Sequence, residues 1–189
     1  MATEGVVAGN YSLGDHLDAG NALTAIRRGG WDVVVLQQGP SSLDESRADL
    51  IASTRRFDAE IRRIGGRTAL YGVWPEKIRF GVFDRVSESY RLAAQDVKGI
   101  YLPAGEAWRA AWRSDSTLAL YGLDDFHPSV EGTYVAALVI YSRLSGRTPV
   151  GLASRLQTRG GAVVNLPAAR ARLLQEAAAA ANATTPGSP

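Results

Sequence analysis

Short apolar runs alternate along the chain with longer segments of helical periodicity. The uninterrupted run at residues 31–37 (WDVVVLQ) predicts a strand buried on both faces, which is typical of a parallel sheet, and residues 68–74 (TALYGVW) predict the next strand. A shorter run at 99–103 predicts a third strand, and Val6 and Val7 predict the end of another. Strands that alternate with helices indicate an α/β fold with right-handed crossovers.

Apolar residues recur at helical spacing between these runs. The first predicted helix starts after Ser12, which stands in capping-box spacing with Asp15, and runs to about Arg28. Ser42 and Glu45 have the spacing of a second capping box. Further helices are predicted at 43–64, 83–97, 104–112, 130–144 and 167–181, the last capped by Asn165, and a small strand at 162–164. We expect one domain over residues 1–181 and a disordered tail over 182–189.

Composition excludes several classes of function. Of 189 residues, 46% are hydrophobic and 21% charged, and the net charge is +2, with the arginines dispersed and not interleaved with aromatics. We therefore expect no nucleic-acid partner. The chain has no cysteine, which leaves no disulfide frame and no thiolate metal site. It has no 18-residue apolar span and no signal peptide at its start, so we expect no membrane partner; the compartment stays open.

The strongest chemical signal lies in residues 118–141. Asp124 precedes His127 by three residues, and Pro128 excludes helix immediately before it. The pair is therefore predicted on a loop directly before the N-terminus of the following helix. A histidine titrates near neutrality and can take a proton from a hydroxyl and return it to a leaving group. A nearby aspartate can fix the tautomer of the ring and stabilise the imidazolium.

The residues around this pair resemble the last sequence block of the SGNH (GDSL-like) hydrolases. D-x-x-H-P-S is followed by E-G-x-Y-x-A-A at residues 131–137. The segment at 31–43 (WDVVVLQQGPSSL) is similar to the third block of that family, and the segment at 6–17 (VVAGNYSLGDHL) to the stretch after its second strand. The resemblance covers roughly residues 5–150. It implies a three-layer α/β/α sandwich with a mainly parallel, flavodoxin-like sheet.

The resemblance also implies roles for individual residues. His127 would shuttle the proton and Asp124 would orient it, completing a serine triad. An oxyanion hole would take one backbone N–H from Gly9. The third block of the family normally adds an Asn side chain, which this chain lacks there. The candidates to replace it are Gln38, Gln37 and Ser41.

One departure from the family is large. Its first block, a central strand ending in Gly-Asp-Ser or Gly-Asn-Ser, carries the nucleophile, and this sequence contains neither motif. We expect a truncated SGNH hydrolase that lacks the first central strand and is inactive or impaired as an ester hydrolase. Ser12, Ser41 and Ser42 lie near predicted strand ends, but each is explained by a capping or turn role.

Two other readings remain open. A non-catalytic carbohydrate-binding domain would use Trp74, Trp108 and Trp112 to stack on sugar rings; Trp74 lies at a strand end and is a candidate either for lining a cleft or for the core. A metal hydrolase built on His16, His127 and an Asp is weaker, because two distant histidines give no ligand spacing. We expect no metal and no cofactor, and the expected partner is a small ester or acylated glycan. The oligomeric state stays open.

Overall fold

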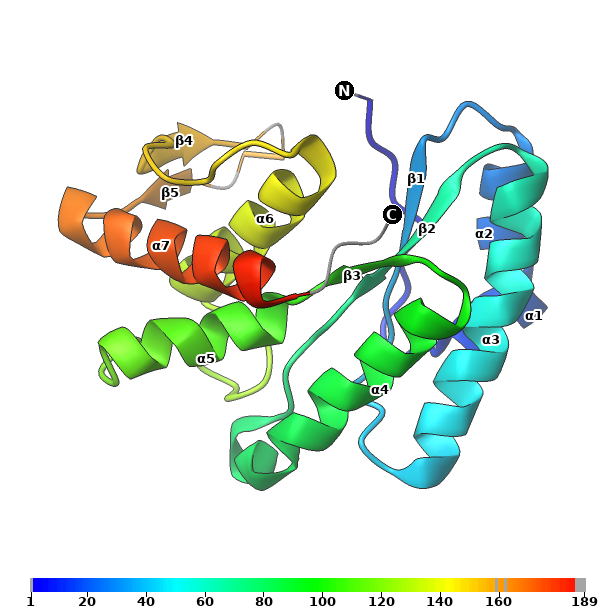
Figure 1. The fold of residues 1–189 in the computed structure, drawn as a ribbon, viewed down its shortest axis with the longest axis horizontal. Helices are drawn as coiled ribbons and strands as arrows, with labels where there is room; N and C mark the ends of the chain where they lie inside the picture. The colour runs from blue at the N-terminus through cyan, green and yellow to red at the C-terminus, as the bar shows by residue number, and fades with distance from the viewer. Residues whose placement is uncertain (1, 159, 162, 186–189) are drawn as a thin grey trace. The chain divides into compact units, whose positions relative to one another are not determined.

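The computed structural model describes residues 2–158, 160–161 and 163–185. These residues form two compact units (Figure 1). The first, which we call the sheet unit, comprises residues 2–73 and 82–101. The second, which we call the helical unit, comprises residues 74–81 and 102–185. No helix in the described ranges is both long enough and apolar enough to cross a membrane.

The sheet unit is built on a three-stranded sheet. Its strands are β1 (Val33–Leu36), β2 (Arg67–Tyr71) and β3 (Ile100–Leu102), in the order β1-β2-β3. β1 and β2 are parallel, with Val33 opposite Arg67 and Leu36 opposite Leu70. α3 (Asp44–Arg63) connects β1 to β2, and α4 (Phe83–Asp96) lies between β2 and β3. The expected α/β class with a parallel sheet is confirmed.

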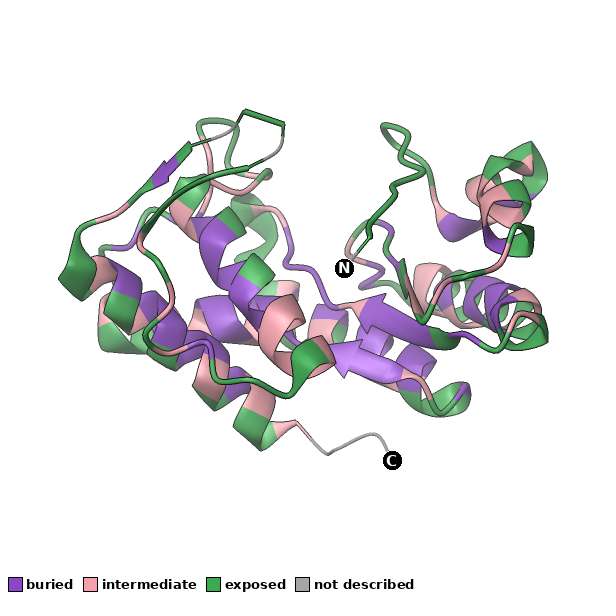
Figure 2. Cartoon of the chain, turned by 90° about the horizontal axis from the view of Figure 1, so that it is seen from above, coloured by how far each residue is buried: buried purple, intermediate pink, exposed green. Residues whose placement is uncertain are grey.

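Helices and strands of this unit share one apolar core. The core residues come from α3, α4, β1 and β2, and also from the N-terminal helices. Figure 2 shows buried residues in purple along the ribbon. The largest wholly buried members are Leu50, Phe57, Ile61, Leu70, Val86 and Tyr90. Those in α3 and α4 recur four or seven positions apart, which follows the apolar stripe in the sequence and is why these two helices were predictable nearly to their ends.

The predicted helix from Ser12 to Arg28 is wrong as a single element. It is two helices, α1 (Leu13–Ala19) and α2 (Asn21–Arg27), which meet at Gly20. Gly20 has φ 75°, a left-handed conformation that ends α1, and glycine adopts it without steric cost. The Ser12–Asp15 capping box is confirmed, since the Ser12 side chain accepts the Asp15 N–H and the Asp15 side chain accepts the Ser12 N–H.

Several predicted boundaries differ from the structure. The first two strands are shorter than the apolar runs that predicted them. The prediction that the strand at residues 31–37 is buried on both faces is wrong, because β1 is an edge strand in which Leu36 is buried and Val35 is exposed. The second capping box is also wrong: α3 begins at Asp44 after Leu43, and the Ser46 hydroxyl accepts the Leu43 N–H. Val6 and Val7 belong to no strand, and residues 2–10 are exposed irregular chain.

The helical unit contains α5 (Ala104–Ser114), α6 (Val130–Ser145) and α7 (Ala168–Thr184). α7 packs on both α5 and α6. A small antiparallel pair, β4 (Arg155–Gln157) with β5 (Val163–Asn165), lies between α6 and α7 in the chain. The unit also holds most of a 3-10 helix, η1 (Lys77–Val82). Three of its tryptophans lie together, as described below.

The C-terminal predictions need two corrections. Asn165 ends β5 and does not cap α7, whose N-cap residue is Pro167 without a side-chain cap. α7 continues to Thr184, so the first residues of the expected tail are helical. The predicted small strand included Ala162, which lies outside the described residues, as do residues 186–189 of the tail.

Candidate active site

A narrow loop between α5 and α6 carries the candidate catalytic pair. Two backbone hydrogen bonds close it: Gly122 N–H donates to His127 O at 2.7 Å, and Ser129 N–H donates to Leu120 O at 2.9 Å. Tyr121 and Pro128 form an isolated antiparallel bridge at the same place. The loop therefore turns back on itself like a hairpin and carries Asp124 and His127 at its tip.

The carboxylate of Asp124 organises this tip. Its Oδ2 lies 2.5 Å from Nδ1 of His127. Its Oδ1 accepts the backbone N–H groups of Phe126 at 3.1 Å and His127 at 2.9 Å. A carboxylate that binds backbone amides two and three residues ahead forms an Asx turn, so the local sequence alone places the two side chains against each other.

These contacts favour the charged form of Asp124. The hydrogen bond to His127, followed by the backbone hydrogen bonds, lowers the pKa of the Asp124 carboxyl to about 2. The Asp124 side chain is 53% exposed and that of His127 is 74% exposed. Among the described residues, Nε2 of His127 has no hydrogen-bond partner. The ring therefore has one nitrogen fixed by a carboxylate and the other open to solvent, as a proton shuttle requires.

The helix behind the loop explains the E-G-x-Y part of the motif. Ser129 is the N-cap of α6, and its hydroxyl accepts the N–H of Gly132 at 3.1 Å. A Cβ at Gly132 would overlap the carbonyl oxygen of Leu120 and lie 2.5 Å from Cζ2 of Trp108. Only glycine lets the first turn of α6 approach the base of the loop this closely. Further along α6, the Tyr134 hydroxyl donates to Ala153 O and accepts from Gln175.

Trp74 lies under the loop and is only 6% exposed. Its indole stacks on that of Trp108, with ring centroids 3.7 Å apart and planes 14° apart, and its Nε1 donates to Phe126 O at 3.0 Å. Trp108 is fully buried, and Trp112 meets it edge to face. Of the two interpretations of Trp74, the structure supports a place in the core of the helical unit, where Trp74 also contacts the loop that carries Asp124 and His127.

The turn after β1 brings Gln38 and Ser41 together. Gln38 is 5% exposed; its Oε1 accepts the Leu13 N–H at the start of α1 (2.8 Å), and its Nε2 donates to Ser41 Oγ (2.9 Å). The Tyr90 hydroxyl donates to Gln38 O, and burial raises the pKa of that hydroxyl. Both candidate oxyanion donors are thus engaged in holding the sheet unit together. Gln37 is exposed, and its Nε2 donates to Gln38 O.

The remaining candidates also lie in the sheet unit. Gly9 is in an exposed turn, and its backbone is accessible. Ser12 caps α1, and Ser42 is buried with its carbonyl bound by Arg85. His16 lies in α1 with its ring against that of Tyr11.

Sequence reasoning missed the segment that holds the loop in place. The backbone N–H of Lys77 donates to Asp125 O at 2.9 Å, and Lys77 Nζ lies 2.8 Å from Asp125 Oδ1. The Tyr121 hydroxyl donates to Pro75 O at 2.7 Å. No periodicity signals contacts across more than 40 residues; the single clue was that residues 74–77 follow a predicted strand end.

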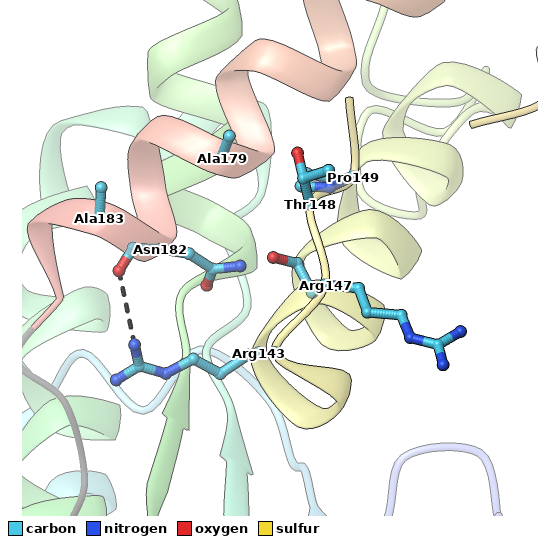
Figure 3. A pocket seen from close by; sticks show the side chains of 9 residues that line it. Arg143, Arg147, Thr148, Pro149, Ala179, Asn182 and Ala183 are labelled. Atoms are coloured by element: carbon cyan, nitrogen blue, oxygen red, sulfur yellow. Dashed lines mark hydrogen bonds between the residues drawn. The ribbon is translucent and has the colours of Figure 1, made fainter. Parts of the chain in front are cut away.

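A surface cavity of about 410 Å³ lies elsewhere in the helical unit, between the end of α6 and α7 (Figure 3). Arg143 and Asn182 line it, and Arg143 Nη1 lies 3.4 Å from Asn182 O. Burial lowers the pKa of Arg143. The side chain of Arg147 points away from the cavity in Figure 3. Neither Asp124 nor His127 lines it, so it is separate from the candidate site. No cluster of metal-ligating side chains occurs among the residues that the structure describes.

The fold is that of an SGNH-hydrolase-like α/β protein, and comparison with solved structures agrees. A protein from Slackia heliotrinireducens, described provisionally as an SGNH hydrolase, matches with TM-score 0.59 and 27% identity over 70% of this chain and 78% of its own. A DUF4886 family protein from Bacteroides uniformis ATCC 8492 matches with TM-score 0.64 and 17% identity, which shows the fold alone. That match covers 86% of this chain and 66% of the Bacteroides chain.

The resemblance to SGNH hydrolases expected from the sequence is therefore confirmed, and the chain has a hydrolase-like fold. No protein-family profile and no curated protein matches the sequence.

Proposed function

We propose that this chain is the acid–base part of a serine acyl hydrolase of the SGNH type. The observation that carries the proposal is the Asp124–His127 pair, with Nδ1 bound to a carboxylate of lowered pKa and Nε2 open. The likeness to the Slackia protein supports the same reaction class. The proposed substrate is a small ester or an O-acetylated carbohydrate.

In the proposed reaction, a serine hydroxyl attacks the acyl carbon while Nε2 of His127 takes its proton. The tetrahedral intermediate then collapses, and the alcohol leaves with the proton from Nε2. A water molecule attacks the acyl-serine by the same route and releases the acid, which restores the serine. Asp124 stays ionised throughout and stabilises the imidazolium. Backbone N–H donors, Gly9 among them, would bind the oxyanion.

The serine is expected from a strand that ends in Gly-Asp-Ser or Gly-Asn-Ser, a motif that residues 1–189 do not contain. We propose that this strand pairs with β1. β1 stands at one edge of the sheet, and Val35 is 41% exposed although its run has the apolar character of a central strand. Natural edge strands are usually protected by charge, proline or a bulge, and the sequence VVVL has none of these.

A second candidate function is a non-catalytic carbohydrate-binding domain, because residues 1–189 lack the motif that carries the nucleophilic serine. Its sugar platform would need exposed indole faces. Trp74 and Trp108 are buried and stacked on each other, so they offer no such platform in this conformation. This burial favours the hydrolase.

The test has two parts, translation of the DNA upstream of Met1 and an assay of ester hydrolysis. The codons before Met1 are translated in frame, and hydrolysis of p-nitrophenyl acetate is measured for residues 1–189 and for the extended polypeptide. We expect an upstream apolar run that ends in Gly-Asp-Ser or Gly-Asn-Ser, and turnover by the extended polypeptide that vanishes when this serine becomes alanine. A stop codon directly upstream, together with no turnover, would contradict the proposal and favour the binding domain.

A further inference from the structure

Two consecutive peptide groups in front of His127 are each held on both sides. In the peptide between Asp125 and Phe126, the C=O accepts the Lys77 N–H at 2.9 Å and the N–H donates to Asp124 Oδ1 at 3.1 Å. In the peptide between Phe126 and His127, the C=O accepts Trp74 Nε1 at 3.0 Å and the N–H donates to Asp124 Oδ1 at 2.9 Å. The donors on one side come from residues 74–77 and the acceptor on the other side is one carboxylate oxygen.

The tryptophan donor is itself rigid. Trp74 is buried and stacks on Trp108, whose own Nε1 donates to Gly132 O at 3.1 Å in the first turn of α6. The indole of Trp74 therefore has little freedom to follow a moving loop. A donor held by packing can fix its acceptor, whereas a flexible surface side chain cannot.

The Lys77 contact acts mainly through the backbone. Its ammonium pairs with the Asp125 carboxylate, but both side chains are more than half exposed, and such pairs contribute little. Asp125 itself has φ 54°, in the left-handed region that residues other than glycine rarely adopt. A hydrogen bond at the carbonyl of this residue helps to keep it in that conformation.

We infer that residues 74–77 form a positioning segment for the proton shuttle, with Trp74 as a positioning residue that acts on His127 through the Phe126 carbonyl. The inference rests on the proposed function only in giving His127 its catalytic role. A histidine ring exposed to this degree can sample several rotamers. Fixing the peptide plane before it restricts the backbone of His127, so that Nδ1 meets Asp124 and Nε2 projects into solvent. Catalysis is sensitive to misplacement of about 1 Å, which makes such a device useful.

The chain offers a matched pair of variants. Trp74→Phe keeps an aromatic ring against Trp108 but removes the N–H that binds Phe126 O. Trp112→Phe removes an equivalent bond, since Trp112 Nε1 donates to Leu118 O at 3.0 Å, outside the tip of the loop. Because the chain has two histidines, the ring N–H and C–H resonances of His127 can be assigned against His16 by NMR.

In the unaltered protein and in Trp112→Phe, we expect a downfield Nδ1–H resonance for His127, the signature of its bond to Asp124. In Trp74→Phe, this resonance should broaden or disappear, and the His127 amide should exchange with solvent about tenfold faster, as loss of one hydrogen bond implies. Thermal melts of both variants separate a general loss of stability from this local effect.

A second pair removes the other donor. Lys77 is the first residue of η1, a position that tolerates proline. Lys77→Pro lacks the N–H that binds Asp125 O, whereas Lys77→Ala keeps it and loses only the ammonium. We expect faster exchange of the Phe126 amide in Lys77→Pro and not in Lys77→Ala. If Trp74→Phe does not fold, the two Lys77 variants still test whether residues 74–77 position the backbone in front of His127.

Unchanged His127 and Phe126 signals in Trp74→Phe and Lys77→Pro, relative to their controls, would overturn the inference. The NMR readout needs no turnover, so it remains decisive if the protein proves not to be a hydrolase. Where the extended polypeptide is active, kcat should fall about tenfold in Trp74→Phe with KM little changed, because the bond positions the shuttle and does not touch substrate.

Discussion

Nδ1 of His127 lies 2.5 Å from Oδ2 of Asp124, and the other oxygen of the same carboxylate accepts the backbone N–H of His127. One side chain thus fixes both the ring and the main chain of the candidate shuttle. Since the two residues are three apart, the arrangement is closed within a single turn of chain. The carboxylate of Asp124 can therefore orient the His127 ring through local contacts alone, without any contact to residues distant in the sequence.

This geometry predicts how stability depends on pH. The folded chain holds the pKa of the Asp124 carboxyl at about 2, below its ordinary value of 3.8, so between these values the folded state binds fewer protons than the unfolded state. The stability that Asp124 adds is present above about pH 4 and is lost as pH falls through about 2. We expect the difference in unfolding free energy between the unaltered protein and Asp124→Asn to shrink over that window in urea titrations.

The control for this prediction is a double-mutant cycle. The hydrogen bond to His127 is the largest cause of the low pKa, so Asp124→Asn in a His127→Ala background should show much less change between pH 4 and 2. An equal change in both backgrounds would show that the side-chain pair does not set the pKa.

The proposed catalytic role of His127 can be tested directly on an active, extended form of the protein. His127→Ala should lower kcat/KM for p-nitrophenyl acetate by about 10³-fold, the size of effect expected for losing a general base. His16→Ala is the matched control, because His16 lies in the sheet unit with its ring against Tyr11 and no role in the proposed reaction. Turnover that survives in His127→Ala would remove this residue from the mechanism.

The neighbouring glutamines make a second matched pair. Gln38→Ala removes the acceptor of the buried Leu13 N–H and the donor to Ser41, so we expect it to lower the unfolding free energy by about 1–3 kcal/mol. Gln37→Ala, at an exposed site, should change it by less than about 0.5 kcal/mol. Chemical denaturation of both variants checks this, and equal stabilities would show that the Gln38 carboxamide is not structural.

The sequence predicted those features that arise from local patterns. The apolar stripe of α3, the presence of a strand at β1 and the Asx-type pairing of Asp124 with His127 each depend on residues within a few positions of one another. The break at Gly20 was hidden because the apolar spacing continues through it, while one left-handed residue decides the geometry. Boundaries shifted where a cap could form at either of two adjacent residues, as at Leu43.

The tertiary part of the site could not be predicted in the same way. Trp74 and Phe126 are 52 residues apart, and Lys77 and Asp125 are 48 apart, so their contacts depend on how the chain folds back. Gln38 looked like a recognition residue because it follows a strand. The neighbours that occupy its carboxamide, Leu13 and Ser41, become apparent only in three dimensions.

The last prediction concerns Gly132, where α6 meets the base of the loop that carries Asp124 and His127. Gly132→Ala would force a methyl group against Leu120 O and Trp108, and overpacking of this kind costs about 1–3 kcal/mol. Because Leu120 O also accepts the Ser129 N–H, relief of the clash should loosen the loop and speed exchange of the Ser129 amide. Gly81→Ala is the control, since a Cβ there meets no atom within 4 Å. Denaturation and amide exchange should separate the two variants; if Gly132→Ala is as stable as Gly81→Ala, the close approach of α6 does not constrain the loop.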